Sequence, residues 1–137
     1  MLDEAQCREV FEQVRRANPA DETEVFIESG HSALTRFANS VIHQNVSEEG
    51  VNVSVRVVVD GRTARATTNK TDAESLRRTV EQALTSARWQ PPDPDLLPLL
   101  GPQRYTLVAR VSAPTAQLTP AARADAVYKV VDRAERS

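Results

Sequence analysis

The sequence predicts an α+β fold, in which an antiparallel β-meander sheet has helices packed on one face. Valines alternate with polar residues from Val51 to Val59, which is typical of a strand with one covered face. Two amphipathic helical patterns, Asp3 to Asn18 and Asp72 to Ala87, lie before and after the strand-forming region. We expect their apolar stripes to cover the valine face.

The first predicted helix runs from Asp3 to Asn18. Asp3 is placed to cap it together with Gln6, and Asn18-Pro19 ends it. Its apolar residues recur at helical spacing, and they are Cys7, Val10, Phe11, Val14 and Ala17. The segment from Thr23 to Ser29 then predicts a half-buried strand, and Gly30 to Ser32 predicts a turn.

Two hairpins are predicted in the strand region. Asn39-Ser40 is typical of a two-residue hairpin turn, because Asn tolerates a positive φ. A further turn is predicted at Ser47 to Gly50, and Asp60-Gly61 closes the hairpin of the valine strand. The strand from Arg62 to Thr68 then returns beside it. The expected pairs across this hairpin are Ala64 with Val57, Arg65 with Arg56, and Ala66 with Val55.

The second helix is expected to begin at Thr71 or Asp72, with Glu74 completing a capping box with Thr71. Most of the eight prolines follow it, which predicts an extended Pro-rich linker with a candidate short strand at Tyr105 to Val111. Thr119-Pro120 opens a C-terminal helix. The predicted organisation is an α+β N-terminal domain over 1–90, the linker over 91–118, and a helix over 119–137 that leads toward a missing C-terminal domain.

Charge and composition narrow the class of partners. The 137 residues carry a net charge of −2, with acidic and basic residues interspersed, which predicts no nucleic-acid binding. No apolar run approaches the length of a membrane span, and the first residues do not resemble a signal peptide. The one cysteine, Cys7, is expected to be buried and inert. These features favour a cytoplasmic protein with no membrane partner.

No catalytic or metal-ligating residue is predicted in this chain. A catalytic zinc site needs about three protein ligands, and His31 and His43 have no partner at ligand spacing. Both histidines are therefore expected to be surface or structural residues. The serines near turns lack the strand-to-helix setting of a nucleophile. We expect the chain to hold no cofactor and to catalyse no reaction alone.

Two surfaces remain as candidates for binding. Arg56 and Arg65 are expected to face each other, which is unfavourable unless an anion or a carboxylate joins them. Two solvated arginines that splay apart are the alternative. An exposed strand edge accepts an extended peptide through main-chain hydrogen bonds, and coverage of that edge by the linker or by a subunit interface is the alternative. The sequence does not say which edge is open.

Four stretches of the chain carry a resemblance to a known family. They are Thr35 to Ser40, Gly50-Val51 leading into Val55-Arg56-Val57, Asp60-Gly61-Arg62, and Ala66 to Asn69 entering the second helix. In this order and spacing the sequence resembles the amino-terminal domain of the TldD/PmbA family. Members are labelled modulators of DNA gyrase and understood as zinc-dependent peptidases. Ala64 departs from the family's pattern, which often has glycine there, and this puts in doubt a close backbone approach at that point.

The resemblance implies a non-catalytic, substrate-facing and assembly domain of a metallopeptidase that acts on unstructured peptides. It implies that zinc is bound by a His-Glu-x-x-x-His motif in the missing C-terminal domain, and that subunits form homo- or heterodimers. The acidic partner of the arginine pair would be that domain, the second subunit or a peptide terminus. The candidate substrate or interface residues are Arg36, Asn39, Arg56 and Arg65. A stand-alone peptide- or protein-binding module, or a metal-less partner subunit, is the alternative.

Overall fold

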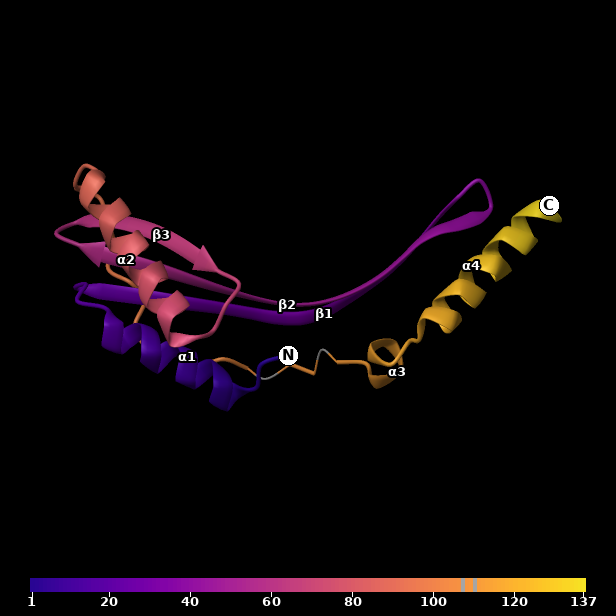
Figure 1. The fold of residues 1–137 in the computed structure, drawn as a ribbon, viewed down its shortest axis with the longest axis horizontal. Helices are drawn as coiled ribbons and strands as arrows, with labels where there is room; N and C mark the ends of the chain where they lie inside the picture. The colour runs from indigo at the N-terminus through magenta and orange to yellow at the C-terminus, as the bar shows by residue number, and fades with distance from the viewer. Residues whose placement is uncertain (107, 110) are drawn as a thin grey trace. The chain divides into compact units, whose positions relative to one another are not determined.

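The fold consists of a three-stranded sheet with helices before and after it. We describe a computed structural model, which covers residues 1–106, 108–109 and 111–137 (Figure 1). The strands lie in the order β1-β2-β3, which confirms the predicted α+β fold with an antiparallel meander. The elements in chain order are α1 (Glu4–Ala17), β1 (Glu22–Ala38), β2 (Val41–Val59), β3 (Arg62–Thr68), α2 (Ala73–Trp89), α3 (Ala113–Ala116) and α4 (Pro120–Glu135).

The described chain divides into two compact units. The first unit comprises Met1–Gly30 and Glu49–Gln103, and the second comprises His31–Glu48 and Arg104–Ser137. Strands β1 and β2 contribute residues to both. The predicted division at residues 90 and 118 stays a prediction.

The core of the first unit lies between α1, α2 and one face of the sheet. Its buried members are Val10, Val14, Val53, Val55, Val57, Ala66, Leu76, Val80, Ala83, Leu84 and Ala87. Helix α2 packs on β3, and α1 packs beside α2 (Figure 1). The valine alternation from Val51 to Val59 is confirmed, because Val53, Val55 and Val57 lie in the core and Val51 and Val59 pack at its margin.

Tight turns join the strands where the sequence predicted them. Asn39 and Ser40 have φ values of 50° and 62°, and Asp60 and Gly61 have values of 49° and 69°. Two successive positive φ values match the twist of a two-residue hairpin, which only a few residue types adopt at low cost. The register confirms Val57 opposite Ala64 and Val55 opposite Ala66. These small alanines leave room for α2 above the sheet.

Two of the predicted turns are wrong. Gly30 to Ser32 lies inside the continuous strand β1, and Ser47 to Gly50 lies inside β2. Both segments are polar because their side chains are mostly exposed. Ladder hydrogen bonds to the neighbouring strand satisfy the backbone there, so the local turn preference of Gly and Ser does not decide the conformation.

Capping side chains fix the starts of both helices of the first unit. The N–H of Gln6 donates to Asp3 Oδ1 at 2.8 Å, and the N–H of Asp3 donates to Gln6 Oε1 at 2.9 Å, which confirms the predicted capping box. In α2 the cap is Asp72, whose Oδ1 accepts from the N–H of Ser75 at 2.9 Å. The box predicted between Thr71 and Glu74 is wrong, because Glu74 pairs with Arg78 one turn further along the helix.

Replacing Asp72 with Asn is expected to make the stability of the first unit less sensitive to acid. The N–H of Ser75 holds the pKa of Asp72 below its ordinary value of 3.8. Because the folded-state pKa is the lower one, the carboxylate stabilises the fold above the unfolded-state pKa, and this contribution is lost as pH falls through the folded-state value. Asn keeps a capping oxygen without titrating. Urea unfolding below about pH 4 should show a smaller acid destabilisation in Asp72→Asn, and an equal pH dependence would contradict this.

The start of the Pro-rich segment is docked on the first unit. The N–H of Asp93 donates to the carbonyl of Gly61 at 2.9 Å, and the N–H of Leu99 donates to Glu22 Oε2 at 2.6 Å. Leu96 and Leu97 line a hollow with Val58, which is buried. This contact explains why an apolar Val58 interrupts the polar face of the valine strand. The candidate strand at 105–111 includes Leu107 and Arg110 and lies partly outside the described residues.

In the second unit, Arg123 of α4 donates hydrogen bonds to both strands of the β1–β2 hairpin. Arg123 Nε donates to Thr35 Oγ1 at 3.1 Å, and its Nη2 donates to Asn45 Oδ1 at 3.0 Å. Its Nη1 donates to the carbonyl of Leu118 at 2.9 Å. The helix start at Thr119-Pro120 is confirmed, with Thr119 Oγ1 accepting from Ala122. Over the part of the chain that the structure describes, no helix has the length and apolar composition to cross a membrane.

Candidate functional site

The polar face of the sheet carries an ion network in the first unit. Arg56 and Arg65 are paired across β2 and β3, as predicted. Their Nη2 atoms lie 3.0 Å and 2.6 Å, respectively, from the two carboxylate oxygens of Glu24 on β1. Ser54 Oγ accepts from Arg65 Nη1 at 2.7 Å. Because side chains alternate along the strand, Ser54 and Arg56 lie on the face opposite to Val53, Val55 and Val57.

The carboxylate that joins the two arginines therefore comes from this chain itself. The alternation of residues from Thr23 to Ser29 puts Glu24 on the side away from Val25 and Ile27, but it does not indicate that β1 lies beside β2 at this level. The position of β1 beside β2 depends on which distant segments of the chain pair. Arg56 Nε is buried and has no hydrogen-bond partner among the described residues, so one donor of the network is unsatisfied.

Replacing Glu24 with Gln is expected to lower the free energy of unfolding by about 1 kcal/mol or less. The side chains of Arg56, Glu24 and Arg65 are 32, 41 and 43 % exposed, so solvent screens much of their attraction. The loss arises because two like charges are left opposite each other. Urea unfolding measures it, with Glu28→Gln as the control for removing one carboxylate from the same strand. Equal effects of the two changes would contradict a specific role for Glu24.

The other two candidate residues belong to the second unit. Arg36 is exposed near the end of β1, and Asn39 forms the turn between β1 and β2. The positive φ of Asn39 gives it a structural role in the hairpin. Of the four candidates, the structure pairs Arg56 with Arg65, and the substrate or interface role of all four stays a prediction.

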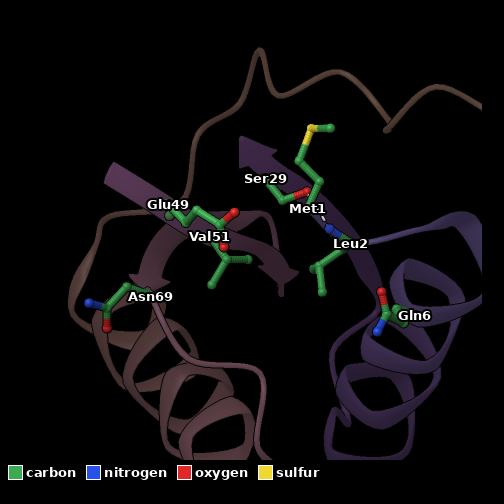
Figure 2. Close-up of a pocket in the computed structure, with 8 residues that line it drawn as sticks. Met1, Leu2, Gln6, Ser29, Glu49, Val51 and Asn69 are labelled. Atoms are coloured by element: carbon green, nitrogen blue, oxygen red, sulfur yellow. Dashed lines mark hydrogen bonds between the residues drawn. The ribbon is translucent and has the colours of Figure 1, made fainter. Parts of the chain in front are cut away.

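A pocket of about 380 Å³ opens on the first unit and was not indicated by the sequence. It is lined by Met1, Leu2, Gln6, Ser29, Glu49, Gly50, Val51 and Asn69. Figure 2 shows Asn69 on one side and Leu2 and Gln6 on the other, with Ser29 and Val51 between them. The N–H of Leu2 donates to Ser29 Oγ at 2.9 Å. Amide, hydroxyl and apolar groups of this kind suit the binding of a side chain. The sequence did not predict the pocket, because Glu49 and Gly50 were expected in a turn and not in β2.

The two histidines and the cysteine lie on three different elements: His31 on β1, His43 on β2 and Cys7 in α1. His31 Nε2 lies 2.8 Å from Ser47 Oγ across the two strands. His43 is exposed on β2, and Cys7 is half-buried in α1, where the sequence predicted a buried thiol. No cluster of three or more His, Cys, Asp or Glu side chains suitable for a metal ion occurs within residues 1–106, 108–109 and 111–137.

Comparison with known proteins gives a family match and three similar solved structures. Residues 23–87 match the family described as PmbA/TldA metallopeptidase domain 1, whereas no curated protein matches the chain. TldE from Thermococcus kodakarensis superposes with a TM-score of 0.77 at 17 % identity, over 90 % of this chain and 28 % of that one.

Two proteins described as modulators of DNA gyrase have the same fold. The one from Bacteroides thetaiotaomicron gives a TM-score of 0.65 at 21 % identity, over 91 % of this chain and 30 % of that one. The one from Thermotoga maritima gives 0.65 at 19 % identity, over 92 % and 28 %. This chain therefore spans less than a third of the length of each of the three structures. Residues 23–87 are thus similar to the first, amino-terminal domain of the TldD/PmbA family.

Proposed function

We propose that this chain is the non-catalytic, substrate-facing and assembly domain of a TldD/PmbA-type zinc-dependent peptidase that acts on unstructured peptides. The observation that carries the proposal is the match of residues 23–87 to the first domain of a metallopeptidase family. In this proposal zinc is bound by polypeptide outside these 137 residues, and the active assembly is a homo- or heterodimer of family subunits in the cytoplasm.

The chemistry of the described surfaces supports a role in binding. The arginine pair is engaged by Glu24, and the pocket beside Leu2 presents amide and hydroxyl groups. Such groups orient a peptide or a neighbouring domain through hydrogen bonds. His31, the histidine of β1, is already within hydrogen-bond distance of Ser47.

The full-length protein is expected to contain stoichiometric zinc and to cleave unstructured peptides, whereas the 137-residue chain is expected to do neither. Elemental analysis measures the zinc, and mass spectrometry of a peptide mixture measures cleavage. The substrate control is a folded protein that contains the same sequences as the peptides. The double variant His31→Ala, His43→Ala in the full-length protein is the metal control, and it should retain its zinc.

Two outcomes would argue against this division of roles. Stoichiometric zinc and peptide cleavage by the 137-residue chain would place the active site in it. A full-length protein that binds peptides without zinc and without cleavage would instead indicate a peptide-binding module or a metal-less partner subunit.

A further inference from the structure

In the second unit, α4 meets one face of the β1–β2 hairpin at Arg123. His31, Ala33 and Thr35 alternate along β1 and therefore lie on the same face of the strand. Arg123 donates to Thr35 Oγ1 at 3.1 Å and to Asn45 Oδ1 at 3.0 Å. These hydrogen bonds hold the half-buried guanidinium group in one position against the hairpin.

A pocket of about 300 Å³, which we call the Arg123 pocket, opens at this point and lies wholly within the second unit. It is lined by His31, Ala33, Thr115, Ala116, Leu118 and Arg123. The arginine and the histidine supply N–H donors, and the remaining lining is one threonine and three apolar side chains. The volume is at the lower end of the range for ligand pockets, so the pocket suits a small organic molecule.

The positive charge of Arg123 is not neutralised by the elements around it. Its hydrogen bonds go to neutral oxygens on the hairpin and on the chain just before α4, and it forms no ion pair among the described residues. No Asp or Glu occurs over 31–47 or over 96–124, and these ranges contain every residue that lines the pocket. A guanidinium group has five N–H donors, so two of those of Arg123 have no partner among the described residues.

His31 can add a further donor to the pocket. Its Nε2 lies 2.8 Å from Ser47 Oγ. A hydroxyl group donates or accepts, so this contact is compatible with neutral His31 protonated at Nδ1 and with the charged imidazole. In both forms the Nδ1–H group is left to donate to a ligand. His31 can therefore bind an anion without a change in its own charge.

We propose that the Arg123 pocket binds a small organic anion through a carboxylate or phosphate group. The oxygen atoms of that group accept hydrogen bonds from Arg123 and His31, and the body of the molecule covers the apolar lining. The second unit contains seven basic and four acidic residues, a net charge of +3, whereas the whole chain carries −2, so its field favours an anion. The alternative is a purely structural Arg123 that only holds α4 against the hairpin. Binding requires neither zinc nor a peptide, so the inference goes beyond the proposed function and can fail independently of it.

The test is an NMR titration of the 137-residue chain, followed through proton–nitrogen correlations of the imidazole rings. The chain contains only two histidines, and His43 is exposed on β2 and does not line the pocket, so it is the internal control. Benzoate and phenyl phosphate should shift the His31 signals saturably, with a dissociation constant of about 1 mM, and leave those of His43 unchanged. The pH and the ionic strength are kept constant, because salt screens an exposed site.

Matched ligands separate the contributions of the charge and of the apolar body. Benzamide has nearly the shape of benzoate but no charge, and it should bind about ten-fold more weakly or less tightly still. Inorganic phosphate has the charge of phenyl phosphate but no apolar body, and it should bind more weakly than phenyl phosphate. Tighter binding of benzoate than of phenyl phosphate would support a carboxylate as the natural ligand group, and the reverse order would support a phosphate ester.

Variants of the protein test the role of the arginine. Arg123→Gln should weaken benzoate binding by about ten-fold or more, because it removes the charged donor. The control is Arg133→Gln, which makes the same change on the same helix at an exposed position outside the pocket, and it should change binding less than about two-fold. If Arg123→Gln loosens α4, the comparison of benzoate with benzamide on the wild-type chain still tests the need for charge.

Four results would overturn the proposal. They are no saturable shift of His31 with either organic anion, equal binding of benzoate and benzamide, equal effects of Arg123→Gln and Arg133→Gln, and binding of inorganic phosphate as tight as that of phenyl phosphate. The last would indicate an adventitious ion only. Absence of zinc from the full-length protein would refute the proposed function and leave the Arg123 pocket unaffected.

Discussion

The Leu76→Ala variant is expected to lose about 2–5 kcal/mol of its free energy of unfolding. Leu76 is 1 % exposed and lies on the face of α2 that packs on the sheet. Removing its branched end costs the transfer free energy of the lost atoms and leaves a cavity that neighbouring side chains fill only in part. Domains of this size are stable by only about 5–15 kcal/mol, so this loss is a large fraction of the total.

Urea unfolding followed by circular dichroism measures this loss. The matched control is Leu100→Ala, because Leu100 is 88 % exposed in the first unit and the chemical change is identical. The control should change stability by no more than about 0.5 kcal/mol. Similar losses in the two variants would show that the core does not lie where α2 meets the sheet.

The Val55→Thr variant is expected to lose about 1–3 kcal/mol. Val55 is 0 % exposed and lies opposite Ala66, in the core beneath α2. Thr has nearly the same shape as Val, so the change places a hydroxyl in an apolar site with almost no change in volume. The cost therefore reports desolvation of the hydroxyl and not a cavity.

The same substitution at Val41 provides the control for Val55→Thr. Val41 begins the same strand and is 62 % exposed, so its hydroxyl would remain hydrated. We expect its stability to stay within about 0.5 kcal/mol of wild type, because Thr also suits a strand. A loss at position 41 as large as that at position 55 would mean that strand propensity and not burial controls the effect.

Local patterns were enough to predict α1, α2, α4 and the valine strand, whereas the short helix α3 lies inside the predicted extended linker and was missed. The helical stripe of α1, its Asp3-Gln6 cap and the Asp60-Gly61 turn depend on residues within a few positions of each other. The hairpin turn also sets the register, so Arg56 opposite Arg65 followed from the sequence. Local patterns failed at Gly30 and Gly50, where pairing with the neighbouring strand continues through residues that often form turns.

The sequence predicted the candidate binding surfaces only in part. The need for an acidic partner beside the arginine pair followed from like charges facing each other, but its identity as Glu24 did not. The family resemblance indicated the domain and did not indicate the pocket beside Leu2. Its lining residues come from the segment before α1, from α1, from both long strands and from the connection after β3, so no single stretch of sequence contains the pocket.

The sequence by itself determined the α+β class, the apolar faces, the caps and the tight turns, because each depends on the periodicity or conformational preference of neighbouring residues. Only the tertiary structure decided that Glu24 joins Arg56 to Arg65 and that Leu96 and Leu97 lie beside Val58. Each of these depends on which distant segments meet. Backbone pairing and burial of the whole chain select those contacts, and no local preference encodes them.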